Sequence, residues 1–132
     1  MIVVDANVIA YLLIPGQYTA ASEKLLLQEQ DWAVPRLWRS EVRNVLANYV
    51  RAGQMEWNDA ALLFDRASQI LGSNEFEVET SDVLRLSKAS GCSAYDCEYV
   101  ALAEFLDLPF VTADAKLRRA FPKRAEALGI SI

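Results

Sequence analysis

The chain alternates short apolar runs of β-forming residues with longer segments of helical periodicity. The strand candidates are residues 2–4, 32–34, 76–78, 109–111 and 130–132. The helix candidates are residues 6–13, 20–30, 37–52, 58–71, 82–90, 94–106 and 115–128, the last broken at Pro122. Strands that alternate with helices form a parallel sheet covered on both faces, joined by right-handed crossovers. We therefore expect a three-layer α/β/α fold.

The chain length is that of one domain. At 132 residues, without a repeat or a linker, the sequence predicts a single domain over residues 1–132. No apolar run approaches the ~20 residues needed to cross a bilayer, and the carboxylate of Asp5 comes too early for a signal peptide. We expect a cytoplasmic protein without a membrane segment.

The chain contains no histidine. This excludes Ser-His-Asp and Cys-His triads, the two-histidine zinc motif and acid–base catalysis by imidazole. The only cysteines, Cys92 and Cys97, are expected to be packed thiols in a reducing compartment. Any acid or base must be a carboxylate, lysine, tyrosine, cysteine or metal-activated water.

The net charge of −5 argues against a protein that grips nucleic acid with its whole surface. Two local basic groups could still contact phosphates, although each is equally well explained as a solvated helix face. They are Arg36, Arg39 and Arg43, and then Lys116, Arg118, Arg119, Lys123 and Arg124.

Four acidic residues are predicted to converge on one edge of the sheet. Asp5 directly follows the first strand, and Asp114 follows the fourth strand by three residues. The carboxyl ends of parallel strands form the binding edge of an open α/β sheet. Glu41 lies in the second turn of the helix after the second strand, and Asp96 near the start of the helix before the fourth. Both helices should begin at that edge.

Asp96 also has a purely structural explanation. With Ser93 as N-cap it resembles a capping box, and an acid near a helix N-terminus is worth roughly 0.3–1 kcal/mol. Asp96 nevertheless continues the row of Tyr99 and Val100, which turns it toward the sheet. Glu98 is rotated from it by about 200° on a regular helix, so we expect a surface charge there.

Several carboxylates cannot share a pocket as bare anions, because their repulsion raises their pKa values. A divalent cation resolves this, and all-oxygen ligands suit Mg²⁺ or Mn²⁺. One or two such ions would polarise a phosphate and activate water for hydrolysis. Asp5 and Asp114 are the expected direct ligands, and Asp96 completes the shell. Glu41 could ligate through water or orient the nucleophile.

Two polar residues at the same edge could support the acids. Asn7 and Thr112 could contact the activated water, the carboxylates or the phosphate. Either could instead cap the turn that follows it.

Four motifs, in order along nearly the whole chain, carry a family resemblance. They are Ile-Val-Val-Asp-Ala-Asn-Val-Ile at the start, the Glu41 helix, Ser-Ala-Tyr-Asp-Cys-Glu-Tyr-Val-Ala-Leu-Ala around Asp96, and Leu-Pro-Phe-Val-Thr-Ala-Asp ending at Asp114. Together they resemble PIN-domain ribonucleases, and more narrowly the VapC-type toxins of VapBC toxin-antitoxin pairs.

The resemblance implies several properties that the sequence pattern alone does not. It implies a five-stranded parallel sheet in the order 3-2-1-4-5, the four acids as the metal site, RNA as substrate, a homodimer, and an antitoxin that blocks the active-site groove. Some relatives carry a further acid shortly after the Asp114 position, where this chain has Lys116. The number of metal ions is left open.

Two other functions remain as alternatives. The first is a catalytically weak interaction module, in which the acids cap helices or hold a structural ion. The second is an aspartate phosphoacceptor domain, since such domains also place Asp after the first strand. It fits less well, because the phosphatase pattern wants Asp where Asn7 stands and the third strand ends without an acceptor Asp.

Overall fold

The computed structural model describes residues 1–129, which form a five-stranded parallel sheet in the order β3-β2-β1-β4-β5. The strands are β1 (Ile2–Val4), β2 (Trp32–Pro35), β3 (Glu75–Phe76), β4 (Phe110–Thr112) and β5 (Ala125–Ala127). The predicted fold class and strand order are confirmed.

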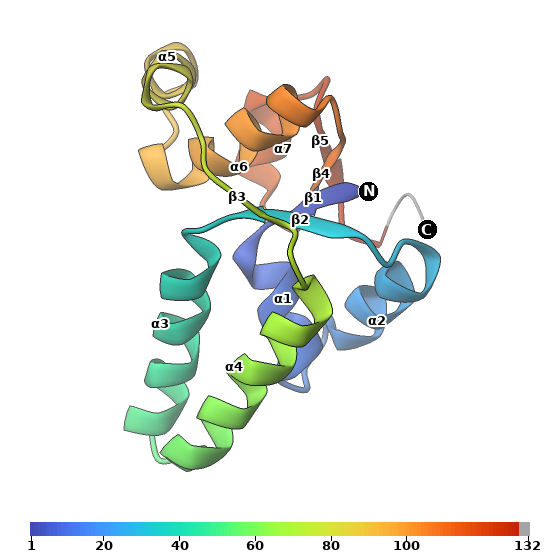
Figure 1. The fold of residues 1–132 in the computed structure, drawn as a ribbon, viewed down its shortest axis with the longest axis vertical. Helices are drawn as coiled ribbons and strands as arrows, with labels where there is room; N and C mark the ends of the chain where they lie inside the picture. The colour runs from blue at the N-terminus through green and yellow to red at the C-terminus, as the bar shows by residue number, and fades with distance from the viewer. Residues whose placement is uncertain (130–132) are drawn as a thin grey trace.

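Helices cover both faces of the sheet (Figure 1). They are α1 (Ala6–Leu13), α2 (Thr19–Gln28), α3 (Trp38–Arg51), α4 (Trp57–Leu71), α5 (Thr80–Ser90), α6 (Ala94–Leu106) and α7 (Ala115–Ala120). Helices α1 to α4 lie on one side of β1–β3 and α5 and α6 on the other, while α7 packs against β4 and β5.

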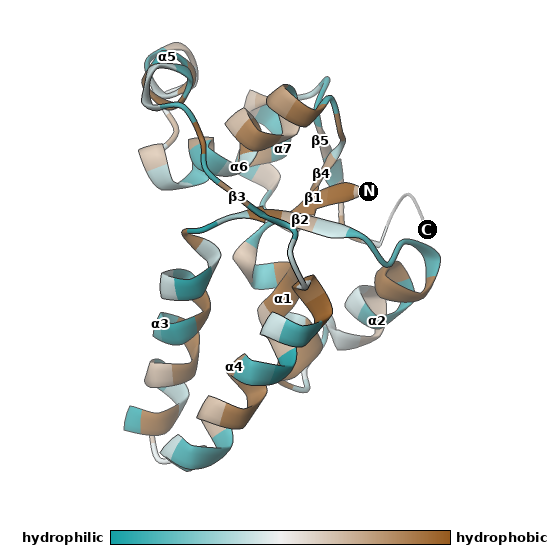
Figure 2. Ribbon diagram, in the orientation of Figure 1, coloured by the Kyte–Doolittle hydropathy of each residue, from teal (hydrophilic) through white to brown (hydrophobic). Residues whose placement is uncertain are grey.

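The core lies around the central strands, whose apolar runs are buried because both faces of the sheet are covered. Val3, Val4, Trp32 and Val34 have no exposed surface. Figure 2 shows hydrophobic residues along β1 and on helix faces that turn toward the sheet. Within residues 1–129, no helix has the length and apolar character needed to span a bilayer.

The two cysteines are part of this core. Cys92 and Cys97 are both buried and carry free thiols. Cys97 begins the buried row on α6, and its sulfur lies 3.9 Å from the carbonyl oxygen of Cys92. The expectation of packed thiols is confirmed.

The fifth strand does not lie where the sequence pattern placed it. The predicted helix over residues 115–128 ends at Ala120, just before Pro122, and β5 occupies Ala125–Ala127 inside that range. Ala-Glu-Ala has little intrinsic β preference, so its pairing with β4 overrides local propensity. The strand predicted at 130–132 lies outside the described residues.

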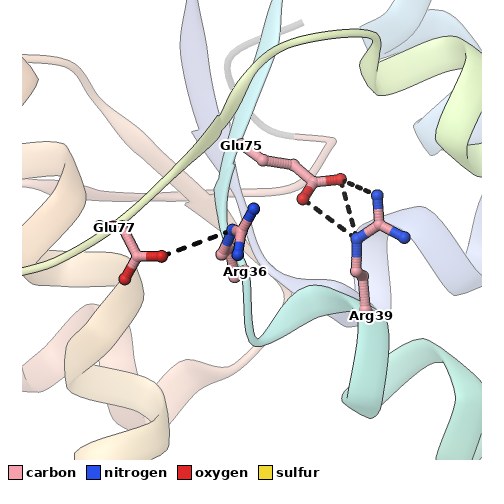
Figure 3. Close-up of polar contacts among 4 residues, drawn as sticks. All are labelled: Arg36, Arg39, Glu75 and Glu77. Carbon is pink, nitrogen blue, oxygen red and sulfur yellow. Dashed lines mark hydrogen bonds and ion pairs between the residues drawn. The ribbon is translucent and has the colours of Figure 1, made fainter.

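Ion pairs connect the short edge strand β3 and the segment after it to the start of α3 and to the turn that precedes it (Figure 3). Arg39 holds Glu75 through Nη2 at 2.6 Å and through Nε at 3.1 Å. Arg36 Nε lies 3.5 Å from Glu77 Oε1. The third arginine predicted to contact phosphates, Arg43, places its guanidinium 4.7 Å from the Phe64 ring centroid. This first basic group is therefore engaged within the fold.

Candidate active site

Asp5 stands where β1 ends and α1 begins. Its carboxylate caps the helix, because Oδ1 accepts a hydrogen bond of 3.1 Å from the backbone N–H of Val8. The residue is only 8% exposed. The fold thus holds a carboxylate in nearly dry surroundings at the carboxyl edge of the sheet.

Thr112, the last residue of β4, joins two of the predicted acids. Its buried hydroxyl donates a hydrogen bond to Oδ2 of Asp5. The Thr112 Oγ1 atom in turn accepts a hydrogen bond of 3.1 Å from the backbone N–H of Asp114. Two of the contacts predicted for Thr112, with a carboxylate and with the following turn, are therefore present at once.

Asp114 is the N-cap of α7. Its Oδ1 accepts a hydrogen bond of 2.8 Å from the backbone N–H of Lys116, and the residue is exposed. Asparagine caps helices about as well as aspartate. An Asn substitution at Asp5 or Asp114 therefore removes the negative charge while keeping the cap.

Glu41 projects from the first turn of α3 and is half-buried. Its Oε1 accepts a hydrogen bond of 2.6 Å from the hydroxyl of Tyr99 on α6. Tyr99 is 2% exposed and stacks on Phe110, with ring centroids 5.9 Å apart. A tyrosine fixed in the core thus fixes the position of the Glu41 carboxylate.

Asp96 is the third residue of α6. Its backbone N–H donates to Ser93 Oγ at 3.1 Å, so the predicted N-cap is confirmed. Tyr99 and Val100, which follow it on the same face, are buried, and the Asp96 side chain is half-buried beside them. The cap accounts for the backbone N–H of Asp96, and a hydrogen bond with Ser93 also lowers the pKa of its carboxylate, which is near enough to Asp114 to sense its charge.

A cleft of about 380 Å³ brings Asp5, Glu41, Asp96 and Asp114 together. Asn7 lies exposed on its wall, and Glu98 does not line it. The other lining residues are Ala6, Leu37, Ser40, Asn44, Val45, Tyr95, Tyr99 and Leu117.

Four polar residues of this cleft were not among the predicted site residues: Ser40, Asn44, Tyr95 and Tyr99. The two tyrosines could have been found from the sequence, because one directly precedes Asp96 and the other follows it by three residues. The signal for Ser40 and Asn44 is similar but weaker, since each lies within three residues of Glu41 on the same helix.

Burial and mutual repulsion raise the pKa values of three of the acids. Burial, together with the charge of Asp96, raises the pKa of Asp5 to about 6 against the hydrogen bonds that it accepts. Burial raises the pKa of Glu41, and the charges of Asp96 and Asp5 add to this. Burial and the charge of Asp114 raise the pKa of Asp96. The four carboxylates are close enough to sense one another.

This charge balance matches the chemistry of a divalent cation site. The side chains that line the cleft offer only oxygen atoms as metal ligands, and Mg²⁺ and Mn²⁺ prefer oxygen ligands. The oxygens of Asp5 that accept hydrogen bonds keep further lone pairs for a cation. Within residues 1–129, no three acidic or cysteine side chains stand in a metal-binding arrangement as they are placed. The oxygen atoms of the four carboxylates thus fit such an ion by their chemistry, but the carboxylates would have to turn inward to enclose it.

Of the second predicted basic group, Lys116 acts on the acids. Its positive charge lowers the pKa of Asp96, opposing the effect of burial. Arg124 is instead held within the fold, where Nη1 lies 3.2 Å from Asp107 Oδ1 and 3.1 Å from the carbonyl oxygen of Leu108. The positively charged side chain of Lys116, at the start of α7, thus lies near enough to the carboxylates to affect them.

The family model of the PIN domain matches residues 2–121, which contain all four acids of the cleft. The chain belongs to the PIN domain family. This match spans every element of the fold up to the end of α7, and only β5 lies beyond it.

Several known proteins are similar to this PIN domain in sequence or in fold. Ribonuclease VapC3 of Pyrobaculum aerophilum is 29% identical over 124 residues, which cover 92% of this chain and 95% of that protein. The crystal structure of PAE2754 from the same organism has a TM-score of 0.76 at 25% identity and covers 96% of this chain and 82% of that one. A toxin-antitoxin complex from Klebsiella pneumoniae has a TM-score of 0.66 at 15% identity, covering 96% of both chains.

Proposed function

We propose that this PIN domain is a divalent-metal-dependent endoribonuclease that hydrolyses RNA phosphodiester bonds. The observation that carries the proposal is the single cleft that Asp5, Glu41, Asp96 and Asp114 all line. They come from four separate segments of the chain, and their mutual repulsion calls for a cation. The similarity to Ribonuclease VapC3 favours RNA as the substrate.

The metal would be Mg²⁺ or Mn²⁺, held by Asp5, Asp96 and Asp114. When bound, such an ion polarises a phosphate, lowers the pKa of an attacking water and stabilises the leaving oxygen. Glu41, held by Tyr99, is placed to accept the proton of that water or to orient it. Thr112 keeps Asp5 and Asp114 in register, and Asn7 is available to the phosphate from the cleft wall.

We further propose that the protein is the toxin of a toxin-antitoxin pair and acts on cytoplasmic RNA. The resemblance to VapC-type toxins supports this role, as does the similarity to a ribonuclease of that name. It implies a homodimer and an antitoxin protein that covers the acid-lined cleft. Addition of the antitoxin should then inhibit RNA cleavage.

The decisive experiment is cleavage of a mixed set of RNAs with Mg²⁺, Mn²⁺ or a chelator. Asp5→Asn, Asp96→Asn and Asp114→Asn should each lower the rate by on the order of 10³ or more, because each removes a ligand without removing a cap. Glu98→Gln is the matched control, since this acid lies on the helix of Asp96 but outside the cleft. It should keep most of the activity.

Three outcomes would each count against a part of this proposal. Activity retained in all three Asn variants would defeat the site assignment. A wild-type protein that binds a partner tightly but cleaves no RNA with either metal would favour the interaction module. A stable aspartyl-phosphate formed from a small phosphodonor would favour the phosphoacceptor alternative.

A further inference from the structure

Tyr95 places an exposed aromatic ring in the acid-lined cleft. It is the second residue of α6 and directly precedes Asp96. The residue is 63% exposed and lines the same cleft as the four acids. Consecutive Cα atoms are about 3.8 Å apart. Because both side chains line the cleft, the ring lies within reach of a nucleotide whose phosphate meets the acids.

The two tyrosines of this helix differ in environment. Tyr99 is 2% exposed, stacks on Phe110 and donates its hydroxyl to Glu41. Tyr95 belongs to none of the aromatic pairs found within residues 1–129, and its hydroxyl makes no hydrogen bond there. When a ligand covers an aromatic ring that was exposed to water, the free energy of the system falls. Tyr95 thus presents a free face to whatever enters the cleft.

Resting on the ribonuclease function proposed above, we propose that Tyr95 stacks on a base of the RNA next to the reacting phosphate and thereby selects unpaired strands. Every base has a flat face that an aromatic side chain can cover, so such stacking tolerates any sequence. In a duplex the bases are already stacked and cannot be splayed onto a side chain. The ring therefore distinguishes single-stranded from paired RNA.

The surroundings of Tyr95 favour a nucleotide over an apolar protein segment. Asn7, Ser40 and Asn44 line the cleft with the four acids and with apolar side chains such as Leu37 and Val45, so Tyr95 stands in a mixed environment of charged, polar and apolar groups. The exposed indole of Trp57 lies in a different groove, between α3 and α4. A cleft with one free ring beside several oxygen donors suits one base and its phosphate.

The first test is equilibrium binding of a labelled RNA strand and of its duplex by fluorescence anisotropy, with Ca²⁺ in place of Mg²⁺. Tyr95→Ala should weaken binding of the single strand by about 5- to 150-fold, the range for one lost base–aromatic stack. Tyr95→Phe keeps the ring and should stay within about twofold of wild type. Duplex binding should be the same in all three proteins.

Phe105→Ala is the matched control for the loss of an exposed ring. Phe105 lies on the same helix and is 75% exposed, but it is outside the cleft. This variant should bind the strand as wild type does. Because both rings are exposed, neither Ala variant should change the melting temperature substantially. Equal weakening in Phe105→Ala and Tyr95→Ala would overturn the proposal.

The second test moves a single abasic nucleotide along the strand. At one position the missing base should weaken wild-type binding by the same factor as Tyr95→Ala. The same abasic strand should cost Tyr95→Ala nothing further, because the pair of changes removes a single contact. Additive losses at every position would overturn the stacking contact.

Metal-dependent cleavage, measured in parallel, separates this inference from the nuclease function. Suppose that the wild type cleaves RNA, while Tyr95→Ala leaves the Kd for RNA and the strand preference unchanged. This result would overturn the stacking proposal alone, and the ring would then be assigned to a contact with a protein partner. Tyr95-dependent binding of unpaired RNA without any cleavage would support stacking and overturn the nuclease. If the wild type neither binds nor cleaves RNA, both the stacking proposal and the nuclease proposal are overturned.

Discussion

The hydroxyl of Tyr99 donates a hydrogen bond of 2.6 Å to Oε1 of Glu41 and so connects α6 to α3 at the acid-lined cleft. This bond lowers the pKa of Glu41 against the effects of burial and of the neighbouring Asp96 and Asp5 charges. The tyrosine has no free path to solvent, since it is 2% exposed. Tyr99 therefore positions Glu41 and favours its ionised form.

Tyr99→Phe should shift the acid limb of the pH–rate profile to higher pH. Without the phenol, the pKa of Glu41 rises further, so a Glu41 that works as the anion is protonated over a wider range. The loss of the hydrogen bond should also lower the free energy of unfolding by about 0.5–1.5 kcal/mol. Rates of RNA cleavage between pH 5 and 9 measure the shift, and a profile that only drops in height would contradict the positioning role.

Asp5→Asn should stabilise the metal-free protein at neutral pH. The folded-state pKa of Asp5 is about 6, above the unfolded value of 3.8. The folded chain therefore holds this proton more tightly, and its stabilising effect is complete below pH 3.8 and lost as the pH rises through about 6. Above pH 7 the buried carboxylate costs roughly 3 kcal/mol, which the variant recovers while keeping the cap.

Urea denaturation of both proteins with a chelator, from pH 4.5 to 8, measures this difference. The stability of Asp5→Asn should exceed that of wild type by an amount that grows up to about pH 7. A constant difference across the range would mean that Asp5 does not titrate as its burial requires.

Mg²⁺ or Mn²⁺ should raise the melting temperature more at pH 7.5 than at pH 5, because protons compete with the metal for the carboxylates. At about 100 times the Kd of the ion, the gain in unfolding free energy is about 2.7 kcal/mol. Scanning calorimetry with matched ionic strength measures it. The same gain in Asp5→Asn and Asp96→Asn would place the ion elsewhere.

Glu75→Gln should lower the melting temperature by a few degrees at low salt. Glu75 receives two arginine nitrogens from α3 and holds an edge strand of only two residues. Glu77→Gln is the matched control, because the Glu77 side chain is 83% exposed and pairs with Arg36 at 3.5 Å. Exposed pairs contribute little, so thermal unfolding of the two variants should differ, and equal effects would contradict this assignment.

The sequence predicted much of the fold because the central elements have strong apolar patterns. The bounds of β1, α1 and α6 match the predicted ranges to the residue. The segment 115–128 failed because its local composition favours a helix throughout, whereas the pairing of Ala125 with Phe110 is a tertiary contact. Such a contact leaves no trace in local periodicity.

The placement of the four acids at one edge followed from strand ends and helix starts. The contacts that hold them could not be derived in the same way. The Tyr99–Glu41 bond spans 58 positions in the chain and depends on how α6 and α3 cross the sheet. The sequence pattern predicts that Tyr99 packs in the core, and the residue is indeed buried. Its hydroxyl gains a second role only through tertiary structure.

The bond between Thr112 and Asp5 joins positions 107 apart, and it exists only when β4 has inserted beside β1. A nascent chain that ends before β4 therefore carries three of the four acids but lacks Asp114 and the Thr112 hydroxyl that holds Asp5. The proposed RNA cleavage would therefore have to wait until β4 and the residues up to Asp114 have been synthesised and have folded beside β1.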